Sequence, residues 1–493
     1  MKAAHLIAGA ALVTGVSLLA FSADDKPPGP GGGKGGKGSK GRDVPIEDLA
    51  SLFRTEVPSH PLDIVLGRPT KNSITASVLA YADREGVIKY GKKTGAPAAK
   101  TAVFALKAGQ PAEVVIAGLQ PDTQFFYRLS TRVGTGAWSA EPEHSFRTQR
   151  ARERTFTFTI QSDSHLDSRV EPKLLERSLL NSLSDSPDFE IDLGDTFMTD
   201  KYHGSRELAA KQYVAQRYYF GLIGHSAPVF LVLGNHDGEM GGARRKDEAI
   251  WSNTMRKKYF ANPVPDDFFS GDTWKHPTLG MLEDYYAWEW GDALFVVLDP
   301  FWFSGDNKGD NWARSLGDAQ YQWLKRTLEG SKAKFKFVFL HHLVGGAMPE
   351  GRGGSEAVPF YEWGGKNQDG TDGFKQHRPG WPMPVHQLLV KNGVTIVFHG
   401  HDHLFAKQEV DGIVYQEVPQ PGNPDKGEKD AIPRMAAEYG YVSGKILGSP
   451  GYMRITVSPE KVTADLVRPV LAEKESAGRK NHGTVFSYDI PVK

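Results

Sequence analysis

The sequence predicts a small all-β sandwich followed by a larger α/β domain. Between residues 61 and 150, short segments alternate apolar and polar residues and are separated by Gly, Pro, Asn and Asp, which is typical of antiparallel strands. From residue 151 onward, strand-like apolar runs alternate with amphipathic helical runs, which indicates an α/β domain that continues to residue 493. A chain of 493 residues is long enough for two or three domains with their own cores.

Four segments of the first domain read as strands, and none of its segments reads as a convincing helix. They are residues 73–81, 101–108, 112–119 and 123–133. Such a set favours a β-sandwich. The stretch that contains Leu119, Pro121, Thr123 and Tyr127 resembles the corner that precedes a core strand in fibronectin type III domains. We see no residues suited to catalysis in this domain.

The N-terminus predicts export. Lys2 is followed by an apolar stretch from Leu6 to Ala20, and Ala20-Phe21-Ser22 offers a cleavage site between small residues, so we interpret residues 1–23 as a signal peptide. The alternative is a membrane anchor, but the apolar stretch is shorter than the roughly 20 residues that span a bilayer. Residues 24–60 begin with a Gly-, Lys- and Pro-rich run and are expected to form a flexible linker. The predicted location is periplasmic, extracellular or at the cell surface.

Composition limits the kinds of binding partner and the types of metal ligand that this chain can have. Lys plus Arg and Asp plus Glu both number 59, so the formal net charge is zero and we expect no nucleic-acid partner. No later segment is apolar enough to predict a membrane span. Cysteine is absent, which excludes disulfides and thiolate metal ligands and leaves oxygen and imidazole donors. Oligomeric state is not predicted.

In the second domain, strand-like runs end at about residues 163, 195, 237, 300, 342 and 403. Helical runs lie at residues 173–183, 206–223 and 320–330. Two insertions, 239–286 and 344–384, carry no clear period and are expected to form rims or a lid, the second being Gly-rich.

Five clusters of metal-binding residue types follow apolar runs in this domain. They contain Asp163 and His165, Asp195, Asn235 and His236, His341, and His401 and His403. Carboxylate, amide and imidazole groups of this number suffice for two metal ions. Two ions about 3.5–4 Å apart can activate water and neutralise phosphoryl oxygens. The ordered set therefore predicts metal-assisted hydrolysis.

These clusters resemble the motifs of the calcineurin-like metallophosphoesterase superfamily. The pattern D-x-H, G-D, G-N-H-D/E, H and G-H-x-H appears here as 163–165, 194–195, 234–237, 341 and 400–403. The resemblance covers essentially the whole second domain. It implies a metallophosphoesterase β-sandwich flanked by helices, with a phosphoric ester hydrolase activity that uses metal-bound hydroxide.

By this resemblance, the first metal takes Asp163, His165, Asp195 and His403. The second metal takes Asp195 as a bridge, with Asn235, His341 and His401. His236 faces the scissile phosphate and protonates the leaving group, and Asn235 also reaches a phosphate oxygen, so the catalytic residues are expected to be His236, Asp195 and Asn235. The ions are zinc, manganese or iron, and the sequence does not choose among them.

Neighbouring residues leave some alternatives open. We choose His341 over His342 as the ligand and expect His342 and His399 to support the site. Purple acid phosphatases, which share the two-domain arrangement, have a tyrosine ligand after the bridging aspartate, whereas Thr196 to Thr199 contain none. Related protein phosphatases pair the active-site histidine with an aspartate at the position of Met198, so Asp200 or Asp237 is the candidate substitute.

The predicted substrate is a small phosphate ester, with monoesters and diesters equally open. Six aromatic residues in and near the insertions could stack on a nucleobase, which would favour a nucleotide, although aromatic side chains more often fill cores; they are Trp251, Tyr285, Tyr286, Trp288, Trp302 and Trp363. A different class of function is a non-catalytic surface-binding module with structural metals.

Overall fold

The computed structural model describes residues 49, 51–244, 246–305, 310–424 and 431–492. The predicted signal peptide and most of the predicted linker lie outside these residues. Among the described residues, no helix has the length and apolar character needed to cross a membrane.

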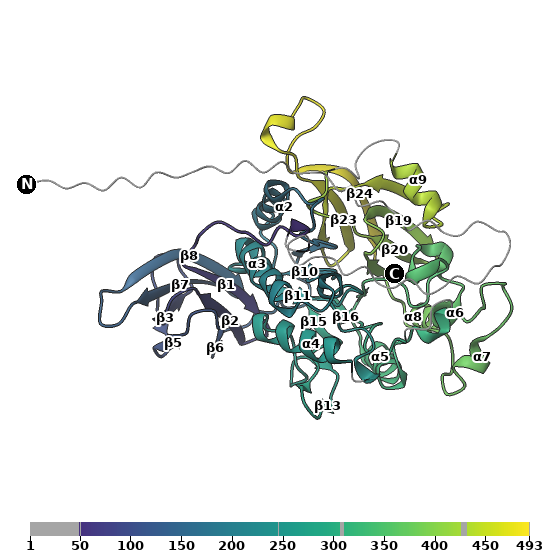
Figure 1. Ribbon diagram of the computed structural model, residues 1–493, viewed down its shortest axis with the longest axis horizontal. Coiled ribbons are helices and arrows are strands. Elements are labelled where there is room, and N and C mark those ends of the chain that lie inside the picture. The colour runs from purple at the N-terminus through teal and green to yellow at the C-terminus, as the bar shows by residue number, and fades with distance from the viewer. Residues whose placement is uncertain (1–48, 50, 245, 306–309, 425–430, 493) are drawn as a thin grey trace, which may run out of the picture. The chain divides into compact units, whose positions relative to one another are not determined.

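A two-sheet β-sandwich forms the N-terminal part, as predicted (Figure 1). One sheet has the order β1-β2-β6, with β1 (Leu62–Gly67), β2 (Ser73–Ala80) and β6 (Ala112–Ala117). The other has β4 (Ala99–Lys100), β3 (Arg84–Gly91), β7 (Gln124–Arg132) and β8 (Ser139–Arg147), with β5 (Phe104–Leu106) also paired to β3. Alternating apolar side chains from both sheets form a shared core that includes Ile64, Val78, Ile88 and Leu129.

Two larger sheets form the α/β part. The six-stranded sheet has the order β11-β10-β9-β22-β23-β24, from β9 (Phe156–Gln161), β10 (Glu190–Asp192), β11 (Val229–Leu231), β22 (Tyr452–Val457), β23 (Lys461–Arg468) and β24 (Gly483–Pro491). The eight-stranded sheet has the order β12-β15-β16-β17-β18-β20-β19-β21. Its strands are β12 (Ser270–Gly271), β15 (Tyr286–Trp290), β16 (Ala293–Val297), β17 (Phe335–Phe339), β18 (Ile396–His399), β19 (Leu404–Val410), β20 (Ile413–Glu417) and β21 (Lys445–Gly448).

The two large sheets pack face to face through an aromatic core. Phe158 of the first sheet lies against Phe295 of the second with ring centroids 5.1 Å apart, and against Phe337 at 5.7 Å. These strands are buried on both faces and therefore read as apolar runs rather than as alternating ones.

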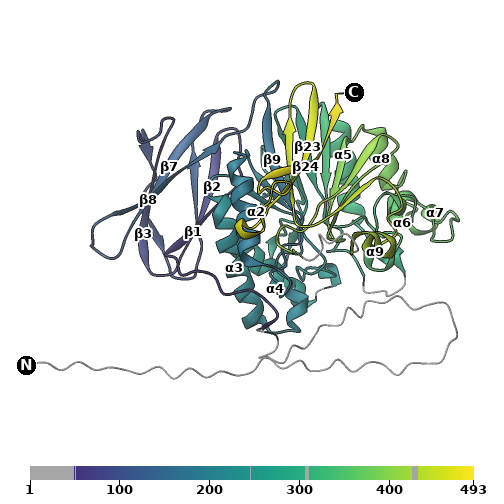
Figure 2. The same ribbon diagram turned by 90° about the horizontal axis from the view of Figure 1, so that it is seen from above.

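Helices cover the outer faces of both sheets (Figure 2). On the side of the six-stranded sheet lie α2 (Pro172–Ser184), α3 (Arg206–Gly224) and α4 (Asp247–Tyr259). Over the eight-stranded sheet lie α5 (Asp318–Gly330) and α8 (Val385–Lys391), with the short helices α6 (Tyr361–Gly364) and α7 (Phe374–His377) beside them and α9 (Ala431–Glu438) near β21. The predicted helical runs correspond to α2, α3 and α5.

The two insertions are more ordered than the sequence suggests. The first contains α4 and the small ribbon of β13 (Lys275–His276) and β14 (Gly280–Met281). In the second, Trp363 is fully buried and Phe374 and Trp381 join the core beneath α5 and α8. This packing holds the second insertion in place and does not suggest a lid.

Short 3-10 turns complete the described elements. They are η1 (Thr199–Tyr202), η2 (Gly242–Arg244), η3 (Asn311–Ala313), η4 (Pro349–Gly351), η5 (Ser355–Ala357) and η7 (Ala472–Lys474).

Arg217 of α3 joins the small sandwich to the α/β part. Its guanidinium donates to the backbone carbonyl of Ser77 at 2.9 Å and to that of Tyr259 at 2.8 Å. Nearby, the Tyr127 hydroxyl donates to the carbonyl of His225 at 2.6 Å. Tyr127, which the sequence placed in a fibronectin-like corner, thus contacts the second part of the chain. The domain boundaries themselves, and the fibronectin type III relationship, stay predictions.

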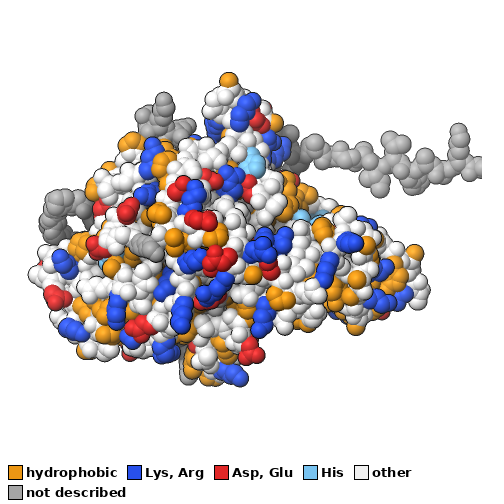
Figure 3. Space-filling view, turned by 180° about the vertical axis from the view of Figure 1, so that it is seen from behind, with side chains coloured by type: hydrophobic (Ala, Val, Ile, Leu, Met, Phe, Trp, Pro, Cys, Tyr) orange, Lys and Arg blue, Asp and Glu red, His pale blue; other side chains and the backbone are white. Residues whose placement is uncertain are grey.

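Charged side chains of both signs are interspersed on the face shown in Figure 3. This distribution agrees with the balanced composition and shows no broad basic surface on that face.

His144 of β8 and His225, which follows α3, stack across the boundary between the two parts with ring centroids 3.9 Å apart. They line a cavity of about 240 Å³ together with His60, Asp63 and Glu141. Burial, followed by the neighbouring His225, lowers the pKa of His144 to about 4, and burial lowers that of His225 to about 4. Both imidazoles are therefore neutral in the folded protein at neutral pH.

We predict that this pair makes the fold sensitive to acid. The folded-state pKa lies below the ordinary value of 6.5, so the unfolded chain binds protons first and stability is lost as pH falls from 6.5 toward 4. His144→Leu should reduce the loss of unfolding free energy between pH 7.5 and pH 5 by about 1–2 kcal/mol. Urea unfolding at both pH values measures this. His203→Asn, at an exposed histidine, is the control; an equal pH response in His144→Leu and wild type would contradict the prediction.

Candidate metal centre

The predicted ligands converge at one edge of the two sheets because most of them follow strands that end there. Asp163 and His165 come directly after β9, and Asp195 comes three residues after the end of β10. His341 follows β17, and His401 follows β18. Parallel neighbours bring these ends together, since β9 pairs with β10 and β17 pairs with β18 in parallel. His403 precedes β19 and reaches the same place from the following turn.

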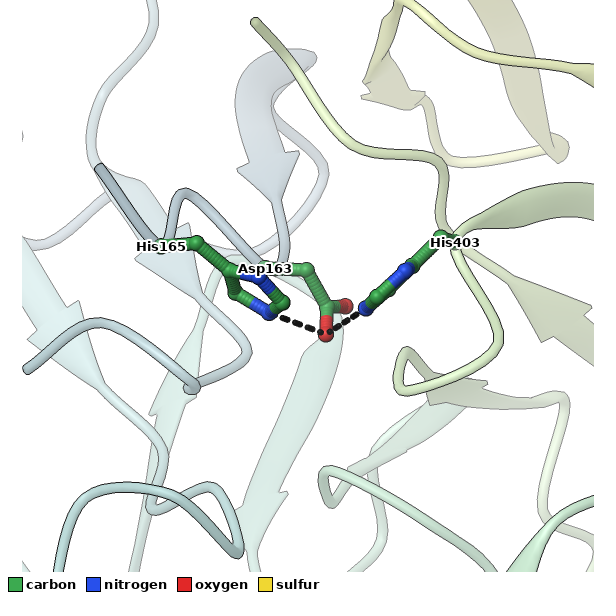
Figure 4. Close-up of side chains that lie close together, drawn as sticks. All are labelled: Asp163, His165 and His403. Atoms are coloured by element: carbon green, nitrogen blue, oxygen red, sulfur yellow. Dashed lines mark ion pairs between the residues drawn. The ribbon is translucent and has the colours of Figure 1, made fainter. Parts of the chain in front are cut away.

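One buried group consists of Asp163, His165 and His403 (Figure 4). The Oδ1 atom of Asp163 lies 3.4 Å from Nε2 of His165 and 3.1 Å from Nε2 of His403. The three potential ligand atoms lie within 4.8 Å of one another, a spacing that suits one metal ion.

A second buried group consists of Asp195, His341 and His401. The Oδ2 atom of Asp195 lies 3.2 Å from Nε2 of His341. The same oxygen is 3.7 Å from Nε2 of His165 in the first group. Asp195 therefore lies between the two groups, at the position from which a carboxylate could bridge two metal ions.

Several of these atoms are buried and have no hydrogen-bond partner. They are Oδ1 of Asp163, Nε2 of His165, Oδ1 of Asn235, Nε2 of His341 and Nε2 of His401. Buried polar atoms are almost always satisfied, because an unpaired one costs about 1–3 kcal/mol. Five such atoms on residues predicted to bind metal fit metal coordination, and the donor set suits zinc, manganese or iron.

Hydrogen bonds on the opposite ring atoms orient two of the imidazoles. Nδ1 of His341 lies 2.8 Å from the carbonyl of Leu193, which only accepts, so this nitrogen carries a proton and Nε2 is the ring atom turned toward Asp195. Nδ1 of His165 similarly lies 3.2 Å from the carboxylate of Asp167. Carbonyl or carboxylate support of this kind is typical of metal-binding histidines.

The charge states of the site follow from burial and from close neighbours. Burial alone would raise the pKa of Asp163 and of Asp195, but adjacent imidazoles hold both well below the usual range, so both are carboxylates. Burial, together with the positive charge of Arg352, lowers the pKa of His401 well below 6.5. His401 is thus neutral, the form that binds metal.

The ligand loops are held in unusual backbone conformations. Five predicted ligands have positive φ angles, namely Asp163 (58°), His165 (50°), Asp195 (54°), His401 (81°) and His403 (61°). Such conformations cost about 1–3 kcal/mol each and cluster at functional sites. At Gly234 and Gly400 a Cβ would collide with Asp195 and Ser162 respectively, so glycine permits the close approach of these loops.

Asp237 fastens two of the loops together. Its carboxylate accepts the backbone N–H groups of Asp195 (3.2 Å), Thr196 (2.8 Å), Phe197 (2.7 Å) and Gly234 (2.7 Å). Burial, then the charge of Asp195, raises the pKa of Asp237 to about 7. Asp237 is therefore occupied by backbone groups and is not the partner of His236.

Two glutamines of α3 support the same loops from the other side. Gln212 donates from Nε2 to the carbonyl of His165 at 2.6 Å and to that of Thr196 at 2.8 Å. Gln216 donates to Oγ of Ser164 at 2.9 Å and also to the carbonyl of Thr196 at 2.8 Å.

His236 lies at the rim of the site with about 20% of its side chain exposed. Its Nδ1 is 3.0 Å from Oδ2 of Asp200, and its Nε2 is 4.0 Å from Oδ2 of Asp195. Of the two carboxylates that the sequence offered as partners, the structure places Asp200 at hydrogen-bond distance. Spacing along the chain did not separate them, because Asp200 lies in η1 and its direction depends on that turn.

The supporting histidines take distinct positions. His341 belongs to the second group, whereas His342 contacts Arg314 through Nε2 at 3.3 Å. His399 pairs with Glu417, Nδ1 to Oε2, at 2.5 Å. Both are buried next to the ligands, as expected for residues that support the site.

The tyrosine nearest in sequence after Asp195 is Tyr202. Its hydroxyl donates to Oε1 of Gln212 at 2.5 Å, and the side chain is buried. This arrangement agrees with the expectation that tyrosine is not a ligand here.

The aromatic residues considered for stacking on a nucleobase do not form such a platform, and most of them fill cores, the alternative that the sequence favoured. Five of the six are buried, with exposures of 0–5%: Tyr285, Tyr286, Trp288, Trp302 and Trp363. Trp251 packs against Tyr213 with ring centroids 5.9 Å apart. These side chains fill the cores, and the apolar surface they bury explains their number in the insertions.

Comparison with known proteins agrees with this geometry. Residues 156–405 match the family model described as calcineurin-like phosphoesterase. No curated protein matches the sequence closely enough to count as a relative.

Two solved structures share the fold over most of the chain. PhoD is similar with a TM-score of 0.62 and 16% identity, over 89% of this chain and 91% of PhoD. A purple acid phosphatase, PPD1 from yellow lupin (Lupinus luteus) seeds, is similar with a TM-score of 0.56 and 14% identity, over 88% of this chain and 74% of that protein. At these identities the likeness concerns the fold.

We predict that Asp195→Asn weakens binding at both metal positions, because a neutral amide cannot bridge two cations as a carboxylate does. Metal content per chain, measured after dialysis against a weak chelator, should fall for both equivalents. His236→Ala is the contrasting variant: its ring is held by Asp200, so metal content should stay near that of the wild type. Loss of metal from His236→Ala would show that His236 is a ligand.

Proposed function

Because the chain belongs to the calcineurin-like phosphoesterase family, we propose that it is an exported enzyme that hydrolyses small phosphate mono- or diesters with two metal ions. One of the structurally similar proteins is named a purple acid phosphatase. The observation that carries the proposal is the pair of buried three-residue groups joined by Asp195. Export is supported by the sequence of residues 1–23.

In this proposal the first ion is held by Asp163, His165, Asp195 and His403. The second is held by Asp195, Asn235, His341 and His401; buried atoms of the last three have no hydrogen-bond partner. When bound, the two ions supply charge neutralisation for the phosphoryl oxygens and a nucleophile derived from water. Zinc, manganese and iron all suit these ligands.

His236 acts on the leaving group. The Asp200 carboxylate accepts a hydrogen bond from the N–H at Nδ1 of His236. The other ring nitrogen, Nε2, is directed toward Asp195. A proton on Nε2 can be given to the departing alkoxide, and the Asp200 carboxylate stabilises the imidazolium that carries it. The amide NH₂ of Asn235 is placed in the same loop and donates to a phosphoryl oxygen.

A non-catalytic binding module is the alternative. The orphaned ligand atoms fit either role, since a structural metal would satisfy them too. The His236–Asp200 pair favours catalysis, because a structural site does not need a partly exposed, oriented imidazole at its rim.

We predict that Asp200→Asn lowers kcat about tenfold, because the neutral amide no longer stabilises the imidazolium of His236. Metal content should not change, since Asp200 contacts His236, which is not a predicted metal ligand. Steady-state kinetics and metal analysis of the variant measure both effects. Asp247→Asn, an exposed carboxylate at the start of α4, is the control. A normal kcat in Asp200→Asn would show that Asp200 does not support His236 in catalysis.

The function is tested by measuring turnover of a phosphate monoester and of the matching diester. Purified protein loaded with manganese or zinc is compared with Asp195→Asn. We expect hydrolysis of at least one ester by the wild type and a large loss in the variant. A faster diester reaction would make the protein a phosphodiesterase, and the reverse a phosphatase. Full metal occupancy without turnover of any ester would favour the binding module.

A further inference from the structure

Arg314 lies beside the candidate metal centre, in a loop that the second insertion holds in place. The loop follows η3, and buried Glu362 accepts from Oγ of Ser315 at 2.7 Å and from the N–H of Leu316 at 2.8 Å. Arg378 also donates to Glu362, at 2.5 Å. The backbone on the C-terminal side of Arg314 is therefore fixed.

His342 lies between the guanidinium of Arg314 and the predicted metal ligand His401. Nη1 lies 3.3 Å from Nε2 of His342, and Nδ1 of His342 lies 3.2 Å from the carbonyl of Leu343. Since a carbonyl only accepts, Nδ1 carries the proton and Nε2 accepts from Arg314. The ring of His342 is in turn 5.2 Å, centroid to centroid, from that of His401. Arg314 is thus one imidazole ring away from a predicted metal ligand.

Arg314 lacks a carboxylate partner among the described residues, unlike its neighbours. Arg352 pairs with Asp402 at 2.9 Å, and Arg378 pairs with Glu362. Glu350 acts on Arg314 only through longer-range electrostatics, and burial is the main effect that lowers the pKa of Arg314. A half-buried guanidinium whose one side-chain hydrogen bond among the described residues goes to the His342 imidazole keeps N–H groups available for an anion.

We propose that Arg314 binds a second anionic group of the substrate, next to the phosphoryl group held by the metal centre. The inference rests on the proposed phosphoesterase function. A phosphoryl group between the two ligand groups would lie near His401, and Arg314 lies one imidazole ring further out. The forked guanidinium suits either a phosphate or a carboxylate. Preferred substrates are therefore phosphate esters with an adjacent second negative charge.

Three non-hydrolysable anions test the proposal on the metal-loaded full chain. Methylphosphonate has one anionic head, methylenediphosphonate adds a phosphate-like head, and phosphonoacetate adds a carboxylate. Competitive inhibition constants and calorimetric dissociation constants are measured for wild type, Arg314→Ala, Arg314→Lys and the control Arg326→Ala, which removes an exposed arginine of α5. Chelation of metal by the two-headed anions is common to all four proteins and cancels in the comparison.

We expect at least one two-headed anion to bind wild type more tightly than methylphosphonate, and Arg314→Ala to weaken that anion about ten- to hundredfold. Binding of methylphosphonate should not change, and Arg314→Lys should keep part of the preference. The anion that loses affinity identifies the second group as phosphate or carboxylate.

Two outcomes would overturn the proposal. Unchanged affinities in Arg314→Ala would show that Arg314 does not touch the ligand. An equal loss for one-headed and two-headed anions would show that it acts on the metal-bound phosphoryl group or through His342. Failure of the wild type both to bind methylphosphonate and to hydrolyse any ester would instead remove the phosphoesterase function itself.

Discussion

The four N–H groups that converge on the carboxylate of Asp237 are the interaction on which the candidate centre depends most. They come from the loops after β10 and β11, which the carboxylate joins. With these loops joined, Asp195 is held in a left-handed conformation between the two ligand groups. His236, two residues after Gly234, then lies with Nε2 4.0 Å from Oδ2 of Asp195. One buried side chain thereby holds the backbone on which Asp195 and His236 are positioned.

Much of the architecture could be predicted from sequence because its signals are local. Period-two segments indicated the small sandwich, and amphipathic runs indicated α2, α3 and α5. The metal-ligand motifs follow strand ends, so the groups around Asp163 and Asp195 could be expected from their order alone. In contrast, α4 has a weak apolar pattern, since its buried face includes Asn253 and Arg256, and it was interpreted as part of an irregular insertion.

What the sequence could not predict depends on contacts between distant segments. The choice of Asp200 over Asp237 beside His236 follows from a turn whose geometry spacing does not encode. Arg314 carries no motif, and its position is defined by Glu362 of an insertion that starts 30 residues later. The aromatic residues of the insertions left two roles open, because composition shows that a large ring is present but only packing shows that it is buried.

Helix α3 couples the unfolding of the small sandwich to that of the α/β part. One of its residues, Arg217, is buried against the small sandwich, and the neighbouring Gln216 holds the loop of the metal centre. A loosened sandwich would leave the buried Arg217 charge with the carbonyl of Tyr259 as its remaining acceptor, one residue from a support of the ligands. The sandwich and the metal centre should therefore unfold in a single cooperative transition rather than as separate modules. The sandwich is then a structural component of the centre, and truncating it would dismantle the site it adjoins.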